Sequence, residues 1–162
     1  MVFIPRDPVM QNQFLVHDSS QGDGTETAGS VVYLSGDELV AVVSGTGNVP
    51  YGFLMQNVKA ESSAHPTGFR LPGDLGSSDA FTGDPVAVAH LGIYDTTFYD
   101  TADTYTAGDW LGVANTGRVS KTNALDIVST VSGGTDYVAV AQNTLGATAV
   151  AAGTNLRIKL LC

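Results

Sequence analysis

Three short stretches decide the fold that we expect: Gly36-Asp37-Glu38-Leu39, Gly83-Asp84-Pro85-Val86 and Gly108-Asp109-Trp110-Leu111. In each, an apolar residue stands three positions after the glycine and begins a mostly apolar run. Glycine adopts the positive φ of a tight turn at no steric cost, and aspartate can accept hydrogen bonds from backbone N–H groups two residues further on. We therefore interpret each stretch as a turn that leads into a β-strand. Gly-Asp at positions 22–23 and 73–74 lacks the apolar run, so the dipeptide alone predicts little.

Strand-like runs recur along the whole chain, rich in β-branched or other apolar residues and separated by glycine, proline and asparagine. They cover residues 30–35, 39–43, 51–58, 85–89, 110–114, 127–131, 137–141 and 156–160. The first two flank Gly36-Asp37 and predict a hairpin. The last alternates apolar and basic side chains, as a strand with one buried face requires. Helical periodicity is weak, although the alanines of 144–152 predict a short helix. We expect an all-β fold, a single small β-sandwich or barrel-like domain, with a β-tulip as one form of it.

The length of 162 residues predicts one domain. Residues 1–13 carry Pro5 and Pro8 and are interpreted as an extended N-terminal arm, because proline cannot continue a helix or donate to a strand ladder. The single all-β domain then covers residues 14–162. The arm is either a frayed end or a segment that clasps a neighbouring subunit. Residues 60–82 form the longest weakly patterned stretch, and long loops in compact domains commonly contact partners.

Charge limits the classes of partner. Seven Lys and Arg against sixteen Asp and Glu give a formal net charge of −9, which repels nucleic-acid phosphates and anionic membrane surfaces. We therefore expect no direct nucleic-acid binding and no membrane association. Charged residues make up 14% of the chain, against roughly 25% in typical soluble domains. Such a surface gives a free monomer little colloidal protection, which favours self-association.

The start of the chain does not fit a secretory signal, because Met1 to Ile4 is followed at once by Pro5, Arg6 and Asp7. We therefore expect synthesis and assembly in the cytoplasm. Cys162 is the only cysteine, so neither an intramolecular disulfide nor a cysteine-rich zinc site is available. We interpret it as a bystander thiol.

Candidate chemical sites are few. His17, His65 and His90 are widely spaced and form no metal-binding motif, and the chain contains no G-x-S-x-G nucleophile elbow. We therefore expect no enzyme activity and no cofactor or metal. An unrecognised hydrolase is kept as a third and least favoured hypothesis. His90 ends an apolar run, where it is interpreted as a strand-end histidine that hydrogen-bonds to backbone.

Acidic and aromatic residues group in a few places. Two acidic groups, Asp18/Asp23/Glu26 and Asp95/Asp100/Asp103, lack the spacing of a calcium-binding loop and are interpreted as solvated turn carboxylates. Trp110, the only tryptophan, is predicted to lie in the core, because a large ring in a small β-domain contributes much buried area. The stretch holding Phe98, Tyr99 and Tyr105 offers an alternative function, a carbohydrate-binding platform such as a fibre or adhesin domain carries.

The segment Tyr105-Thr106-Ala107-Gly108-Asp109-Trp110-Leu111-Gly112-Val113-Ala114-Asn115-Thr116-Gly117-Arg118-Val119-Ser120 resembles a segment common in capsid decoration (cement) proteins of tailed bacteriophages. The shared pattern is Ala-Gly-Asp, a hydrophobic residue, any residue, Val, a short glycine turn, a basic residue, Val, then Ser or Thr. Gly83 to Val88 and Tyr51 to Lys59 are similar in style. The resemblance covers about half of the chain.

This resemblance implies a structural virion protein without catalytic residues. Such a protein sits on the outer capsid surface, often as a homotrimer, and binds the major capsid protein and its own copies, assembling in the host cytoplasm. An acidic chain with an extended arm agrees with that role. The contact residues that we predict are apolar or proline residues of the arm and of the long loop: Val2, Phe3, Ile4, Pro5, Phe69, Leu71 and Leu75.

Overall fold

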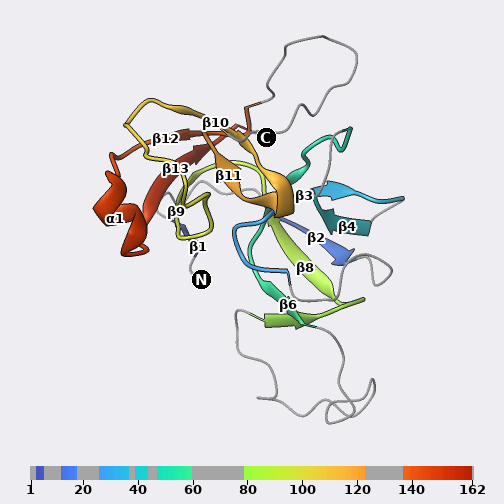
Figure 1. Ribbon diagram of the computed structural model, residues 1–162. Coiled ribbons are helices and arrows are strands. Elements are labelled where there is room, and N and C mark those ends of the chain that lie inside the picture. Colours follow the sequence, from blue (N-terminus) through green and yellow to red (C-terminus); the bar gives the residue numbers. More distant parts are fainter. Residues whose placement is uncertain are drawn as a thin grey trace.

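The computed structural model describes residues 3–5, 12–17, 26–36, 39–43, 47–59, 79–122 and 137–161. It confirms the predicted all-β class. Within these ranges the strands form a closed barrel, a six-stranded sheet and a small two-stranded ribbon, and the one α-helix spans five residues (Figure 1). The predicted strand 127–131 and residues 60–78 of the long loop lie outside the described residues.

The barrel contains five strands in the order β2-β4-β3-β5-β8 and closes because β8 pairs with both β5 and β2. Its strands are β2 (Asn12–His17), β3 (Val31–Leu34), β4 (Leu39–Val42), β5 (Gly52–Leu54) and β8 (Pro85–Ala89). Among the five barrel strands, only the β2–β4 pair is parallel. The β3–β4 pairing confirms the predicted hairpin. The predicted strand 51–58 is interrupted at Met55 and Gln56, and its second part, β6 (Asn57–Lys59), pairs in parallel with β7 (Asp79–Phe81) to form the ribbon.

The six-stranded sheet has the order β1-β9-β13-β12-β10-β11 with every pair antiparallel. Its strands are β1 (Phe3–Pro5), β9 (Ile93–Thr96), β13 (Leu156–Leu160), β12 (Ala139–Ala141), β10 (Trp110–Val113) and β11 (Val119–Ser120). The helix α1 (Ala147–Ala151) follows β12 and confirms the helix predicted near 144–152. A 3₁₀ turn (Asn115–Gly117) connects β10 to β11.

Residues 3–5 of the predicted arm are an edge strand of this chain's own sheet. Phe3 is 9% exposed, and its ring stacks on Tyr94 and on Phe53, with centroids 4.4 and 5.8 Å apart. Residues 12 and 13 already belong to the barrel strand β2. The described parts of the arm are therefore built into both halves of the fold.

Side chains of opposite parity on the barrel strands enter two separate cores. Val31, Phe53 and Ala89 join the inner side chains of the sheet in one cluster. Val32, Leu54 and Val88 join Val58 and Ala80 of the ribbon in a second cluster. Strands buried on both faces require continuous apolar runs, which is why Val86 to Ala89 shows no alternation. In contrast, β13 alternates buried and exposed residues as predicted, because its outer face is free of such a layer.

Two Gly-Asp turns have the same hydrogen-bonding arrangement. Gly83 and Gly108 have φ of +83° and +96°. In the first turn the N–H of Asp84 donates to the carbonyl of Phe81, while the N–H of Phe81 donates to the Asp84 carboxylate. Asp109 and Thr106 repeat both bonds, at 2.9 and 2.8 Å. In these two bonds each carboxylate accepts from the N–H three residues before it, in addition to any bond of the predicted kind to an N–H two residues further on.

Candidate functional site

Trp110 lies at the surface, so the prediction that it belongs to the core was wrong. It is 55% exposed, and its ring contacts that of Tyr137, which is 49% exposed, with centroids 5.4 Å apart and planes inclined at 49°. The reason is strand parity: Leu111 and Val113 point into the core, so Trp110 must point outward. We call Trp110 and Tyr137 the aromatic pair.

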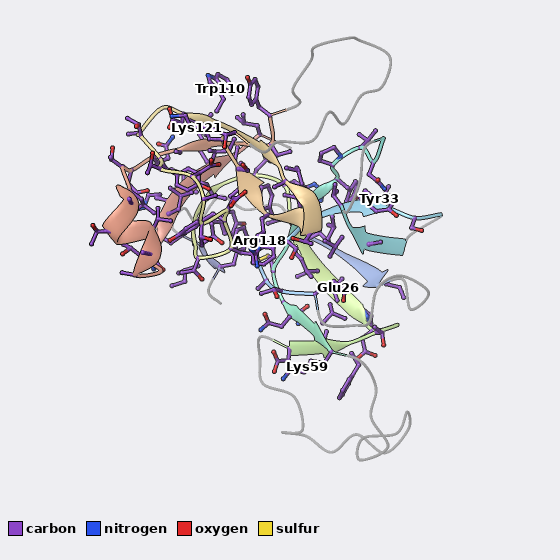
Figure 2. The ribbon with its side chains drawn as sticks, in the orientation of Figure 1. Glu26, Tyr33, Lys59, Trp110, Arg118 and Lys121 are labelled. Atoms are coloured by element: carbon purple, nitrogen blue, oxygen red, sulfur yellow. The ribbon has the colours of Figure 1, made fainter. Side chains whose placement is uncertain are left out.

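Positive side chains stand near the aromatic pair. Lys121 Nζ lies 2.8 Å from the Asp109 carboxylate, directly before Trp110 (Figure 2). The hydrogen bonds from Lys121 and from the Thr106 N–H lower the pKa of Asp109 below its ordinary value. Across the sheet, Trp110 is opposite Val140, which in turn is opposite Lys159, and all three are on the outer face. The aromatic pair therefore belongs to a sheet face that combines apolar side chains with two lysines, of which Lys121 is paired with Asp109.

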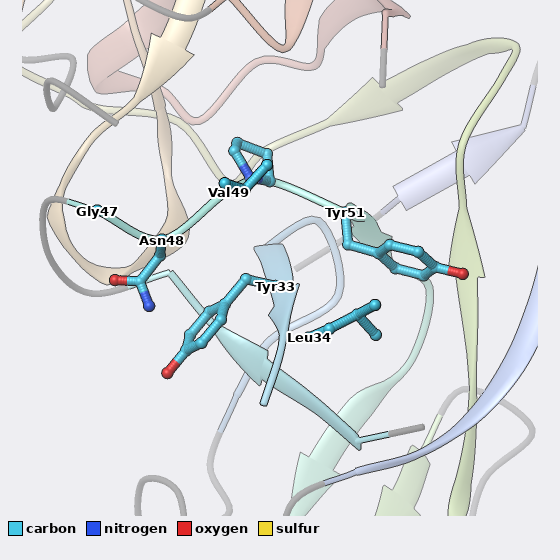
Figure 3. A pocket seen from close by; sticks show the side chains of 7 residues that line it. Tyr33, Leu34, Gly47, Asn48, Val49 and Tyr51 are labelled. Atoms are coloured by element: carbon cyan, nitrogen blue, oxygen red, sulfur yellow. The ribbon is translucent and has the colours of Figure 1, made fainter. Parts of the chain in front are cut away.

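A second apolar surface is a pocket of about 390 Å³ on the barrel (Figure 3). Its lining comes from the end of β3 and from the segment before β5: Tyr33, Leu34, Gly47, Asn48, Val49, Pro50 and Tyr51. Leu34 is 44% exposed and Val49 is 68% exposed. None of the seven lining side chains carries a charge at neutral pH. We call this hollow the barrel pocket.

His90 supports one wall of the barrel pocket. Its ring meets the Tyr51 ring edge-on, with centroids 4.6 Å apart. The His90 Nε2 atom is buried and has no hydrogen-bond partner in the part of the chain that the structure describes, so the predicted backbone bond is not made at this nitrogen. His65 and the side chain of His17 lie outside the described residues. No group of three metal-binding side chains occurs among the described residues.

Two of the predicted solvated carboxylates are buried, so that prediction was wrong for them. Asp95 is 3% exposed, and its carboxylate lies 2.9 Å from Arg157 Nε. Asp103 is 4% exposed and accepts hydrogen bonds from the Ser120 hydroxyl (2.7 Å), the N–H groups of Lys121 and Thr122 (2.7 and 3.2 Å) and the Thr122 hydroxyl. Asp18 and Asp23 lie outside the described residues.

The pKa of Asp103 reflects two opposing effects. Burial raises the pKa of this carboxyl, but the hydrogen bonds from Thr122, Ser120 and the backbone of Lys121 outweigh burial and leave the pKa below its ordinary value of 3.8. Asp103 is thus a fixed anion that holds β11 and the two residues after it.

The predicted sugar platform at Phe98, Tyr99 and Tyr105 does not exist, because these side chains are 7%, 2% and 1% exposed. The Tyr99 hydroxyl donates to the Thr154 carbonyl at 2.7 Å, and the Tyr105 hydroxyl donates to the Asp100 carbonyl at 2.8 Å. Burial raises the pKa of both hydroxyls. Among the described residues, the aromatic side chains more than a third exposed are those of the aromatic pair.

The predicted contact residues have different positions. Phe3 belongs to the core, whereas Ile4 is 39% exposed and points to the outer face of the sheet; Pro5 ends β1. The others, Val2, Phe69, Leu71 and Leu75, lie outside the described residues.

Sequence reasoning missed both the aromatic pair and the barrel pocket. The alternation of Leu111 and Val113 along β10 was a usable signal for an outward-facing Trp110. The barrel pocket had no such local signal, because it forms where residues 47–51 lie against the end of β3.

No protein-family model matches this chain, and no curated protein matches it. Among the described residues, no helix has the length and apolar character needed to cross a membrane.

Proposed function

We propose that this chain is a structural virion protein that decorates and stabilises the outer surface of an icosahedral bacteriophage capsid. It binds the major capsid protein and its own copies, and it catalyses no reaction. The observation that carries the proposal is the presence of two exposed apolar surfaces, the aromatic pair and the barrel pocket, on one small acidic chain. Exposed aromatic side chains rimmed by polar groups are typical of protein–protein interfaces.

The resemblance to decoration proteins supports the same role. The segment that carries it, residues 105–120, forms the Gly-Asp turn, β10, the 3₁₀ turn and β11, and it presents Trp110 to solvent. The net charge of −9 keeps the chain away from a packaged genome. A low density of charge lets copies of the chain approach one another and a capsid shell closely.

The test compares phage particles that carry the chain with particles that lack its gene. Particles without it are expected to lose infectivity faster on heating or with a chelator, and adding the purified chain back restores resistance. An Ile4→Asp variant probes the exposed contact residue of β1, with Ala147→Asp on the exposed start of α1 as the matched charge control. Equal inactivation curves with and without the chain, or a failure to sediment with capsids, would refute the proposal.

A carbohydrate-binding role is the second candidate, because the aromatic pair presents two exposed rings side by side. A glycan array compares the wild-type chain with Trp110→Ala. Binding that disappears in the variant supports this candidate, and the absence of binding at millimolar glycan disposes of it.

A further inference from the structure

The aromatic pair and the barrel pocket are two exposed apolar features of different form, one projecting and one hollowed. Trp110 projects from the outer face of the sheet (Figure 2), with the exposed Tyr137 ring against it, whereas the pocket lies on the barrel (Figure 3). Figure 2 shows Trp110 and Tyr33 on separate parts of the molecule. A chain therefore cannot fill its own pocket with its own Trp110, but a second copy can supply it.

The pocket suits an indole ring in size and chemistry. Its volume of about 390 Å³ exceeds the lower end of small-molecule sites, roughly 300 Å³. Its apolar walls include Leu34 and the ring of Tyr51 and carry no charge, so an entering ring does not have to desolvate a charged group. A buried tryptophan also needs a partner for its indole N–H. The Asn48 side-chain carbonyl and the Tyr33 hydroxyl are acceptors within the lining.

Charge favours a second copy of this acidic chain as the occupant. Lys121 lies beside Trp110, and Lys159 lies two strands away on the same face. Lys121 is paired with Asp109 and Arg157 with Asp95, so these two pairs are neutral, while Lys159 adds a positive charge to the same face. The whole chain carries −9, so a second acidic copy meets less repulsion at this face than the net charge of the chain alone would give.

We propose that Trp110 of one copy, supported by Tyr137, inserts into the barrel pocket of the next copy. The contact is heterologous, because a different surface is used on each side. Repeated heterologous contacts generate a ring when the rotation closes, which is the symmetry that a trimer requires. This inference deepens the proposed function and rests on it for the biological role of the ring, although the contact itself is a property of the free chain.

Trp110 is the only tryptophan, so its fluorescence reports directly on this contact. As the concentration of the wild-type chain rises, the solution mass is expected to increase while the emission shifts to the blue, because the indole leaves water. Two variants remove one side each: Trp110→Ala removes the inserted ring, and Val49→Asp places a charge in the pocket wall. Each is expected to weaken self-association roughly 10-fold or more. Both positions are more than half exposed, so folding is retained, and circular dichroism checks this.

Mixing the two variants is the decisive experiment. The Trp110→Ala chain keeps an intact pocket, and the Val49→Asp chain keeps its tryptophan, so a 1:1 mixture forms one intact contact and stops at a dimer. The fluorescence of Val49→Asp is expected to shift to the blue when Trp110→Ala is added. The double variant, which has neither surface, produces no shift and serves as the control. Ala147→Asp assembles like the wild type.

Several results would overturn the inference: a wild-type chain that remains monomeric, single variants that assemble normally, or a mixture that shows neither dimer nor blue shift. Assembly of both variants on their own would place the contact elsewhere. If the wild type is monomeric and binds a glycan that Trp110→Ala does not bind, the aromatic pair is a sugar-binding surface instead. Capsid binding is measured separately, so a chain that assembles in solution yet never binds capsids refutes the proposed function and leaves this contact standing.

Discussion

Replacing Asp103 tests how the end of the sheet is held in place. Its buried carboxylate accepts four hydrogen bonds from Ser120, Lys121 and Thr122. Asp103→Ala removes all four acceptors. In Asp103→Asn, the amide oxygen can still accept from the Ser120 hydroxyl and from the N–H groups of Lys121 and Thr122. The amide NH₂ group then faces the Thr122 hydroxyl, which can rotate to accept a hydrogen bond from it. The alanine variant is therefore expected to lose more stability than the asparagine variant.

The size of the loss follows from which donors are left without a partner. One hydrogen bond to a charged group contributes about 1.5–3 kcal/mol. The four do not add, because Lys121 and Thr122 are exposed and water can replace the acceptor for their N–H groups. Ser120 is fully buried, so water cannot replace the acceptor that its hydroxyl loses, and the full cost of an unpaired buried donor remains. We expect a cost of about 3 kcal/mol for Asp103→Ala and about 1.5 kcal/mol for Asp103→Asn. At roughly 2–4 °C per kcal/mol, alanine lowers the Tm by about 6–12 °C.

The effect depends on pH in a defined direction. The pKa of Asp103 in the folded chain lies below its ordinary value of 3.8, so the carboxylate contributes its full stabilisation above that value. This contribution is lost as the pH falls through the lower, folded pKa. The difference in stability between the wild type and Asp103→Asn is therefore largest near neutral pH and shrinks below 3.8.

Urea unfolding followed by circular dichroism measures these differences, with thermal scans at neutral and acidic pH. The control is Asp109→Asn, whose carboxylate is partly exposed and pairs with Lys121, and which is expected to cost about 0.5–1 kcal/mol. An alanine cost below about 1 kcal/mol would show that the four bonds do not hold the sheet end. Equal costs for alanine and asparagine, or a deficit that does not shrink in acid, would contradict the argument from charge.

Two further substitutions test local strain and the role of β1. Gly117→Ala is expected to cost about 2–4 kcal/mol by urea unfolding, because φ is +73° and the new Cβ meets Val42 Cγ1 at 2.7 Å. Gly83→Ala has a similar φ of +83° but open space, so about 1 kcal/mol is expected; equal costs would exclude the steric argument. Phe3→Ala removes a ring stacked on Tyr94 and is expected to cost about 3 kcal/mol; an unchanged unfolding midpoint would mean that β1 does not contribute to the core.

Much of the β-structure could be predicted from the chain because the signals were local. The Gly-Asp turns, the β3–β4 hairpin and the alternation in β13 each depend on a few neighbouring residues. The barrel and the sheet could not be separated in this way. Both use similar apolar strands, and the assignment is set by distant pairings such as β2 with β8 and β1 with β9.

The surface aromatic residues were misjudged for a different reason. The size of the ring alone favours a buried Trp110, and the stretch with Tyr99 and Tyr105 offers an exposed platform only as an alternative; in the structure Trp110 is exposed and both tyrosines are buried. Parity within a strand decides which face a ring takes, and the two tyrosines are buried because their hydroxyls reach backbone carbonyls. Asp103 shows the same limit for carboxylates, since its donors lie 17 to 19 residues away.

The placement of β1 has a consequence for how the chain folds during synthesis. All five barrel strands lie within residues 12–89, so the barrel can close before the rest of the sheet has left the ribosome. At roughly 5–20 residues per second, Phe3 waits several seconds for β9, the strand with which β1 pairs. After β8 (Pro85–Ala89) has emerged, β13 (Leu156–Leu160) has still to be synthesised, and until then the barrel face that carries Val31, Phe53 and Ala89 lacks most of its cover. The nascent chain is thus most prone to aggregate after β8 emerges and before β13 completes the sheet.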